Sequence, residues 1–275
     1  MKSIFTREIR LNLKNVIIWS LSVGLIGMAC ILLYQNMQGD IAEMADAFSN
    51  MGAFSDAFGM STLSIATLSG YFATEVGTVH GLGGGMFAAI IAISILSKEE
   101  EGHSGEFLLS LPVSRTKVVL AKGLSVVLSI IFFTIVCALL YMAGFKALNE
   151  EIPMKEFMTF MGMNLLMNIE VAAICFGISS MNGKNKTGLG LGIALIFYVY
   201  DLIGRVVPDL KDFLFIGPYS YANASSIFSG KETDASAVTV AVIVTVVAVI
   251  SSFVVYNKRD LGRKAKYSDP KDHNC

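Results

Sequence analysis

Six long runs of apolar residues dominate the sequence and limit what the chain can fold into. A helix needs about 20 mainly apolar residues to cross the hydrocarbon core of a bilayer, and lipid offers no hydrogen bonds to exposed backbone groups. Apolar runs of this length are therefore predicted to be membrane-spanning helices. The six candidate spans cover residues 16–34, 79–96, 123–145, 157–181, 187–204 and 237–256.

The composition agrees with this interpretation, because 54% of the residues are hydrophobic and only 16% are charged. Soluble domains carry roughly a quarter charged residues. The connections between the apolar runs are too short for a large soluble domain, so we expect a single all-α membrane domain over residues 1–275. Its surroundings are then the lipid bilayer, and nucleic acid is not an expected partner.

The distribution of lysine and arginine predicts the orientation of the spans. If the N-terminus is cytoplasmic, sixteen of the 21 basic residues fall on the cytoplasmic side, including those of the tail over residues 258–275. By the positive-inside rule, both termini are expected in the cytoplasm, with the chain in the cytoplasmic membrane. A seventh span within residues 57–74 would place the basic tail outside, so we interpret this uncharged stretch as an outer-face or partly re-entrant segment.

Residues 4–16 are predicted to form an amphipathic helix in the membrane interface, with its basic face towards anionic headgroups. The apolar face comprises Phe5, Ile9, Leu13 and Val16, and the basic face comprises Arg7, Arg10 and Lys14. This helix is either an anchor or a lateral elbow that moves with the first span.

The most polar interior stretch, SKEEEGHSGEFLLSLPVSRTKVVLAKG, covers residues 97–123. Gly102 is a natural helix stop, and Pro112 prevents a helix from continuing smoothly. The pattern predicts a helix, a short transverse helix and a further helix; a solvated loop is the alternative. The short helix would present an apolar knob of Phe107, Leu108 and Leu111 and an acidic rim of Glu99, Glu100, Glu101 and Glu106.

The third span should begin after this stretch, with Ser114 at the start of its helix. Two lysines, Lys117 and Lys122, lie just before the apolar run. Long basic side chains at such positions extend to the lipid headgroups. We therefore expect both lysines at the membrane surface.

The segment EEEGHSGEFLLSLPVSRTKVVLAK resembles the first cytoplasmic loop of ABC-2 type exporter permeases. In that family an acidic, glycine-containing turn precedes Leu-Leu-Ser-x-Pro-Val-Ser-Arg and then Ala-Lys or Gly-Lys. Members often have Gly-Thr where this chain has Gly-His-Ser-Gly, and IGPYSYANASSIFSG, residues 216–230, resembles a later outer loop more weakly. The matching residues are Glu101, Gly102, Glu106, Leu108, Leu109, Ser110, Pro112, Val113, Ser114, Arg115, Ala121 and Lys122.

This resemblance implies a permease subunit that moves a substrate out of the cell, with ATP bound and hydrolysed by a separate ATP-binding cassette subunit. It also implies a second permease copy, identical or different, and no cofactor in this chain. The short helix would be the coupling helix that docks on the ATP-binding subunit. The predicted partner-coupling residues are Glu101, Gly102, Glu106, Phe107, Leu108, Leu111, Pro112 and Arg115.

Catalytic and metal-binding motifs are not found in the sequence. No G-x-x-x-x-G-K-[ST] phosphate loop occurs, and NGKNKTG has similar letters in the wrong order. The segment GHSGE lacks the final glycine of a G-x-S-x-G nucleophile elbow. The histidines, His80, His103 and His273, are scattered, so we expect a transport subunit rather than an enzyme.

Two acidic residues lie within the apolar runs. Glu170 is near the middle of the fourth span, where an ionised carboxylate costs at least a few kcal/mol. It belongs either to a substrate or proton path or to a protonated packing contact. Asp201 precedes Arg205 by four residues, a spacing that favours a local ion pair.

Two other functions remain open from the sequence. A proton-coupled secondary transporter would use Glu170 as its proton carrier, and a membrane scaffold or sensor would transport nothing. For a transporter, the apolar outer segments are compatible with a peptide, a lipid, an antibiotic or another amphiphile as substrate.

Overall fold

The computed structural model describes residues 1–101, 113–181 and 186–258, and in these ranges the chain is nearly all helical, with no strand. Six of the described helical segments are long and apolar enough to cross a membrane, which confirms the predicted all-α fold class. They are α1 (Lys2–Ser49), a composite second segment (Leu68–Ile93), α7 (Arg115–Ala147), α8 (Met154–Met181), α9 (Thr187–Val206) and α12 (Ala235–Lys258).

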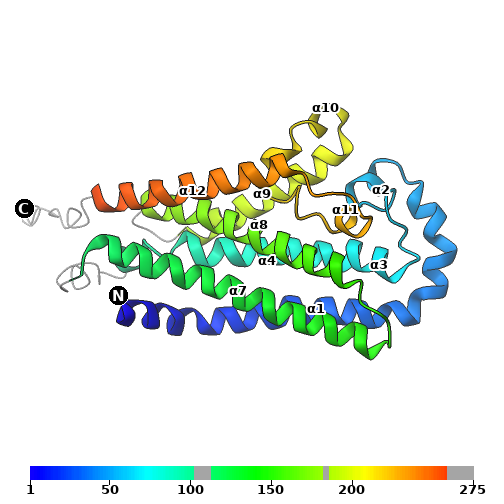
Figure 1. The fold of residues 1–275 in the computed structure, drawn as a ribbon, viewed down its shortest axis with the longest axis horizontal. Helices are drawn as coiled ribbons and strands as arrows, with labels where there is room; N and C mark the ends of the chain where they lie inside the picture. The colour runs from blue at the N-terminus through cyan, green and yellow to red at the C-terminus, as the bar shows by residue number, and fades with distance from the viewer. Residues whose placement is uncertain (102–112, 182–185, 259–275) are drawn as a thin grey trace, which may run out of the picture.

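The long helices lie side by side along one direction, and the start of α1 and the end of α12 are at the same end of the bundle (Figure 1). We call this end the basic end, because the first turns of α1 and α7 and the last turn of α12 carry Arg7, Arg10, Arg115, Lys117 and Lys258. The short helices α2 (Ala53–Phe58), α10 (Pro208–Lys211) and α11 (Ala224–Phe228) gather at the opposite, far end.

Helix α1 is continuous for 48 residues, about 72 Å measured along its axis at 1.5 Å per residue, and its last turns curve over the far end of the bundle (Figure 1). The prediction of a separate interfacial helix over residues 4–16 is wrong in this respect, because these residues are the first turns of the spanning helix. No proline interrupts them. Ile4 is buried against Val118 and Ala121 of α7, so protein rather than lipid covers part of the apolar face.

The second span begins at Leu68, earlier than the predicted residue 79. It consists of α3 (Leu68–Tyr71), a π-helical turn (Phe72–Val76) and α4 (Gly77–Ile93). The Thr67 hydroxyl caps its start by accepting a 3.0 Å hydrogen bond from the Gly70 amide. The expected re-entrant segment over residues 57–74 is therefore divided: its first part lies in α2 and turns, and its last part belongs to the span.

The second span does not continue as one helix to Glu101, and the helix stop expected at Gly102 lies outside the described residues. Helix α4 ends at Ile93, residues 94–97 form turns, and the short helix α5 (Lys98–Glu101) follows.

At the other end of the bundle, the Asp234 carboxylate accepts hydrogen bonds from the hydroxyl and the amide of Ser236 at the start of α12. These two bonds lower the pKa of Asp234, which keeps the cap ionised.

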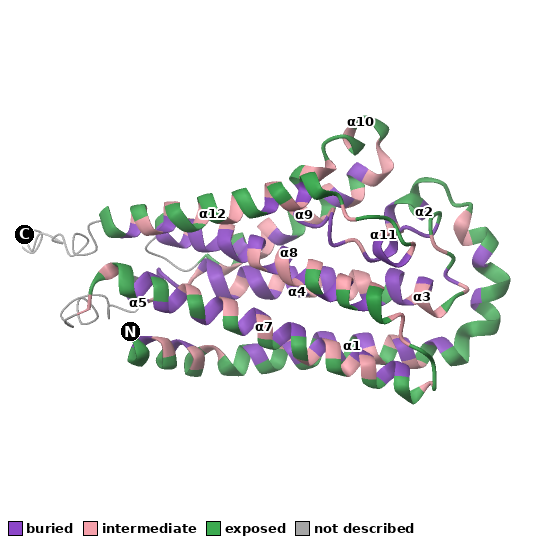
Figure 2. Cartoon of the chain, viewed as in Figure 1, coloured by how far each residue is buried: buried purple, intermediate pink, exposed green. Residues whose placement is uncertain are grey.

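Helix α4 lies in the centre of the bundle, while α12 is exposed along most of its length (Figure 2). At the far end of the central segment, the buried Phe72 ring packs against a group of aromatic rings, with centroid distances of 5.2 Å to Phe228 and 5.4 Å to Phe145. The core is therefore organised around the second span, and lipid is the natural cover for the apolar outer faces of α7, α9 and α12.

Helices α1 and α7 approach each other closely at glycines of α1. A Cβ atom added at Gly27 would lie only 2.3 Å from Cε1 of the buried Tyr141, and one at Gly24 would lie 2.5 Å from Cδ1 of Leu140. Small residues allow membrane helices to pack at short distance. Gly39, farther along α1, has no atom within 4 Å of its added Cβ.

Replacing Gly27→Ala should therefore destabilise the protein, because overpacking a tight contact costs about 1–3 kcal/mol, more than the gain in helix propensity. Gly39→Ala is the matched control and should leave stability unchanged or slightly higher. Thermal unfolding of the two purified variants in the same detergent tests this. Equal melting temperatures for both variants would contradict the proposed packing of α1 on α7.

Candidate functional site

A cluster of four charged side chains lies inside the basic end of the bundle. Glu8 comes from α1, Lys98 and Glu99 come from α5, and Lys122 comes from α7. Glu8 and Lys122 are 1% and 0% exposed, and Glu99 is 4% exposed, so three of the four charges are removed from solvent. We refer to these four residues as the ion cluster.

Lys122 is the centre of the ion cluster. Its Nζ lies 2.5 Å from Oε2 of Glu99 and 3.4 Å from Oε1 of Glu8, and it also donates a hydrogen bond to the Ile95 carbonyl. The second oxygen of Glu8 accepts a hydrogen bond from Lys98. Two carboxylates and two ammonium groups balance in charge, and Lys122 donates two hydrogen bonds and forms a further ion pair with Glu8.

The interruption between α4 and α5 explains one of these contacts. In a continuous helix the Ile95 carbonyl would accept a bond from the amide four residues on. The turns over residues 94–97 free this carbonyl for Lys122. They are fixed in turn to α8, because the Leu96 amide donates a 3.0 Å hydrogen bond to Oγ of Ser179.

The ion cluster corrects two expectations from the sequence. Lys122 does not extend to the headgroups, since its whole side chain is buried; Lys117, by contrast, is exposed as expected. Glu99 points into the bundle and binds Lys122, so it does not belong to an acidic rim that faces a partner. Buried ion pairs are costly to desolvate and persist only with close geometry and additional hydrogen bonds. The close contacts of Lys122 meet this requirement.

Most of the predicted partner-coupling residues lie outside the described residues: Gly102, Glu106, Phe107, Leu108, Leu111 and Pro112. Glu101 is the last residue of α5. Arg115 begins α7, and its Nη1 donates a 3.4 Å hydrogen bond to the Asn257 carbonyl of α12. Glu101 directly follows the ion-cluster residues Lys98 and Glu99 in α5, and Arg115 begins the helix that carries Lys122.

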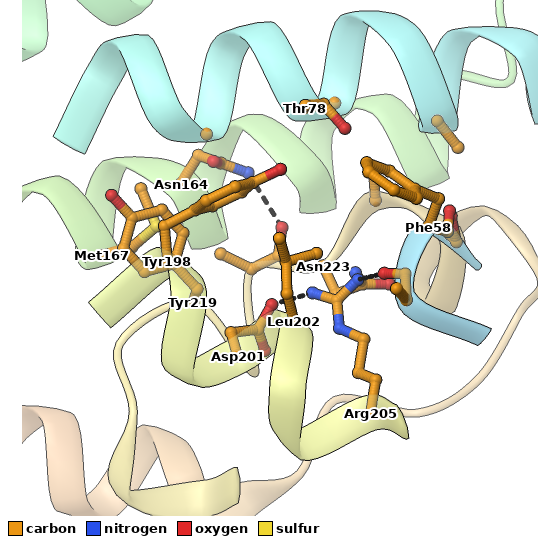
Figure 3. A pocket seen from close by; sticks show the side chains of 17 residues that line it. Phe58, Thr78, Asn164, Met167, Tyr198, Asp201, Leu202, Arg205, Tyr219 and Asn223 are labelled. Carbon is orange, nitrogen blue, oxygen red and sulfur yellow. Dashed lines mark hydrogen bonds and ion pairs between the residues drawn. The ribbon is translucent and has the colours of Figure 1, made fainter. Parts of the chain in front are cut away.

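At the far end, a cavity of about 40 Å³ lies between α2, α4, α8, α9 and the segment before α11 (Figure 3). Asn164, Asp201 and Arg205 contribute polar groups to its wall. This volume suits one water molecule or a few, whereas organic ligands occupy sites of about 300–1,000 Å³. The cavity is thus too small to be the binding site of an organic substrate.

The predicted ion pair between Asp201 and Arg205 is confirmed. Arg205 also donates from Nη1 to the Ala57 carbonyl at 3.1 Å, which ties α9 to α2 (Figure 3). Asp201 is only 1% exposed, so the pair is largely buried rather than at the surface. Its geometry indicates that it holds the far-end helices together.

Glu170 of α8 is buried and has a specific partner. Its Oε2 accepts a 2.7 Å hydrogen bond from the hydroxyl of Tyr221, which lies in the connection before α11. Burial raises the pKa of Tyr221, and the carboxylate of Glu170 adds to this effect, so the phenol remains a proton donor. This hydrogen bond gives Glu170 a defined packing contact between α8 and the connection before α11.

A second concave feature is an apolar groove of about 190 Å³ between α7, α8 and α12. Leu120, Leu124, Phe176, Val249 and Phe253 are among its lining residues, and no charged residue lines it. The groove lies on the outer surface of the bundle, where membrane lipid covers exposed apolar faces.

Comparison with known families identifies the family to which this chain belongs. Residues 2–261 match the family described as ABC-2 family transporter protein. The chain belongs to the ABC-2 family of transporter proteins. The match confirms the resemblance seen in residues 99–122 and extends it over nearly the whole chain. None of the curated proteins compared with the sequence matches it.

The membrane domains of ABC-2 transporters are transport subunits, and the six helices able to span a membrane agree with that role. The ion cluster was not predicted, although three of its residues lie in or beside the segment that carries the resemblance. One feature of the sequence could have indicated a buried charge: Lys122 lies among mainly apolar neighbours in the sequence. Glu8 gave a second signal, because it is an acid on an otherwise basic helix.

Removing the Glu170 side chain should destabilise the connection before α11, which contains Tyr221. Glu170→Ala would leave the Tyr221 hydroxyl buried without its acceptor, which costs about 1–3 kcal/mol. Glu170→Gln retains a carbonyl oxygen for the same bond and is the matched control, with stability close to that of the unaltered protein. Thermal unfolding in detergent distinguishes them, and an equal loss in both variants would show that the charge, not the hydrogen bond, matters.

Proposed function

We propose that this ABC-2 chain is the permease subunit of an exporter in the cytoplasmic membrane. It would move its substrate across the bilayer with energy from ATP, which a separate ATP-binding cassette subunit binds and hydrolyses. The observation that carries the proposal is the family match over residues 2–261, together with six helices able to span a membrane. No cofactor is assigned to this chain itself.

The position of the predicted coupling segment supports this role. Residues 102–112 connect α5 to α7, and the residues on both sides, Glu99 and Lys122, meet in the ion cluster. A partner that contacts this segment differently in its ATP-bound and ATP-free states could shift the helices, because a ligand changes an equilibrium only through such differential contacts.

A second permease copy completes the proposed complex. The far-end cavity of this chain is too small for an organic substrate, which is consistent with a path formed between two permease subunits rather than within one. The second copy can be identical to this chain or a related one.

The proton-coupled alternative requires Glu170 to exchange protons with a transport path. Its hydrogen bond to Tyr221 supports a structural role instead. That alternative predicts transport driven by a proton gradient without ATP and its loss in Glu170→Gln. A scaffold or sensor would show no ATP-dependent transport in any variant.

The orientation proposed here places the basic end in the cytoplasm, in accordance with the positive-inside rule. In a background without the four native cysteines, a membrane-impermeant maleimide should label Met44→Cys at the far end of intact cells. Lys117→Cys at the basic end should be labelled only after the cells are opened. Both positions are exposed in the structure, so access is decided by the membrane. Labelling of Lys117→Cys in intact cells would invert the proposed topology.

The double variant Phe107→Asp/Leu108→Asp tests the coupling segment. We expect it to insert normally but to lose co-purification with the ATP-binding subunit and ATP-dependent transport, because two charges replace the apolar knob. Phe213→Asp/Ile216→Asp is the matched control, since both residues are exposed large apolar side chains at the far end. A partner that still co-purifies with the first variant, with transport intact, would exclude this segment as the coupling site.

A further inference from the structure

We infer that the ion cluster joins the first turns of α1 to α5 and α7, and that Glu8 is the positioning residue through which α1 follows their movement. Helix α1 would then carry a displacement from the basic end to the far end of the protein. This inference rests on the proposed function, because the movement it transmits is the one that an ATP-binding partner would produce.

The contacts of Glu8 carry the first step. Glu8 is the residue of α1 in the ion cluster, and its two carboxylate oxygens contact two different segments. Oε2 binds Lys98 of α5, and Oε1 lies 3.4 Å from Nζ of Lys122 in α7. One side chain of α1 therefore contacts both helices that flank the segment assigned to the partner by the proposed function.

Burial carries the second step. Glu8 is 1% exposed and Lys122 is 0% exposed, so a relative shift of the helices that parts these charges leaves both of them inside the protein. Breaking a buried ion pair leaves an uncompensated charge, which is strongly unfavourable. The three segments are therefore expected to move together rather than slide past one another. The contact of Ile4 with Val118 and Ala121 adds an apolar attachment beside the ion cluster.

The continuity of α1 carries the third step. The helix is continuous from Lys2 to Ser49, so a shift of its first turns is passed along one hydrogen-bonded helix to the turns that curve over the far end (Figure 1). At the far end, Ile41 and Ala45 pack with Met60 and Ile65, and the Tyr34 hydroxyl donates a 2.6 Å hydrogen bond to the Ala66 carbonyl. Helix α1 thus has a fixed attachment at each end of the bundle.

The test uses variants that differ in their effect on the ion cluster. Glu8→Gln removes the charge, Glu8→Asp keeps it, and Arg10→Gln removes an exposed charge two residues away. Glu8→Gln/Lys98→Gln removes one acid and one base, so the remaining Glu99–Lys122 pair, 2.5 Å apart, stays balanced. This double variant keeps the test informative if Glu8→Gln alone fails to fold.

Hydrogen exchange of the chain in lipid nanodiscs, without any partner, measures the attachment itself. Amides of residues 2–14 are expected to exchange faster in Glu8→Gln and in the double variant than in the unaltered chain, Glu8→Asp or Arg10→Gln. Unchanged exchange in both charge-removing variants would overturn the inference, whether or not the chain is a permease.

The transmission is measured in the complex with the co-expressed ATP-binding subunit, with and without ATP. Single cysteines in a background without native cysteines, Lys117→Cys on α7 and Met44→Cys on α1, report the maleimide labelling rate at each end. In the complex with unaltered Glu8, ATP should change both rates. In Glu8→Gln or the double variant, the change at Lys117→Cys should persist, while the change at Met44→Cys should fall by about fivefold or more. Glu8→Asp should restore it, which loss of overall stability would not explain.

The outcomes separate the two proposals. A full ATP response at Met44→Cys in the charge-removing variants would overturn the role of Glu8 while leaving the permease function intact. If ATP changes the labelling rate at neither cysteine when Glu8 is unaltered, the proposed function is contradicted. The inferred transfer of movement along α1 is then contradicted as well. The exchange measurement would then still decide whether the ion cluster holds α1.

Discussion

The ammonium group of Lys122 sets the constraint on which the basic end of this structure depends. A lysine that is fully buried in a membrane protein requires carboxylates and hydrogen-bond acceptors at close range. No single helix supplies them: Glu8 comes from α1, Glu99 from α5 and a carbonyl from the turn at Ile95. Three segments distant in sequence must therefore meet at one point. The turns that interrupt the end of the second span contribute to this meeting, because they include Ile95, whose carbonyl binds Lys122.

The far end is held together by different means. There the buried Phe72 ring lies among other aromatic rings, Arg205 links α9 to α2, and Tyr221 binds Glu170. Glycines of α1 and α4 bring helices close enough for such contacts: a Cβ atom at Gly85, for example, would lie 2.0 Å from the hydroxyl of Tyr219. The far end has a buried ion pair of its own, Asp201–Arg205, but both partners belong to α9, whereas the ion cluster joins three separate segments. Apolar packing and single hydrogen bonds between segments are rearranged at lower cost than buried ion pairs, so segments at the far end can shift relative to one another more readily.

Much of the fold could be predicted from the sequence, because length and hydropathy determine which segments can span a bilayer. The pair Asp201–Arg205 could also be predicted, since a spacing of four residues is a local property of a helix. The start of the second span at Leu68 could not, because the serines, threonines and glycines before residue 79 weaken the apolar signal, whereas in the structure those from Ser69 to Thr78 are buried or half-buried in protein. The ion cluster could not be predicted either. Glu8 and Lys98 are 90 residues apart in the sequence, and a lysine near the end of a span can bind either lipid headgroups or a buried carboxylate.

The continuity of α1 determines how movement at the basic end reaches the far end. A chain with a flexible joint between an interfacial helix and its first span could absorb movement at the basic end locally. Here the residues that would form the joint are helical and carry Glu8 into the ion cluster. Movement imposed on α5 and α7 is therefore transferred to one continuous helix of 48 residues, whose curved last turns pack against Met60 and Ile65 at the far end (Figure 1). In a permease of this kind, rearrangement is expected where packing is apolar, with the ion cluster moving as a rigid unit.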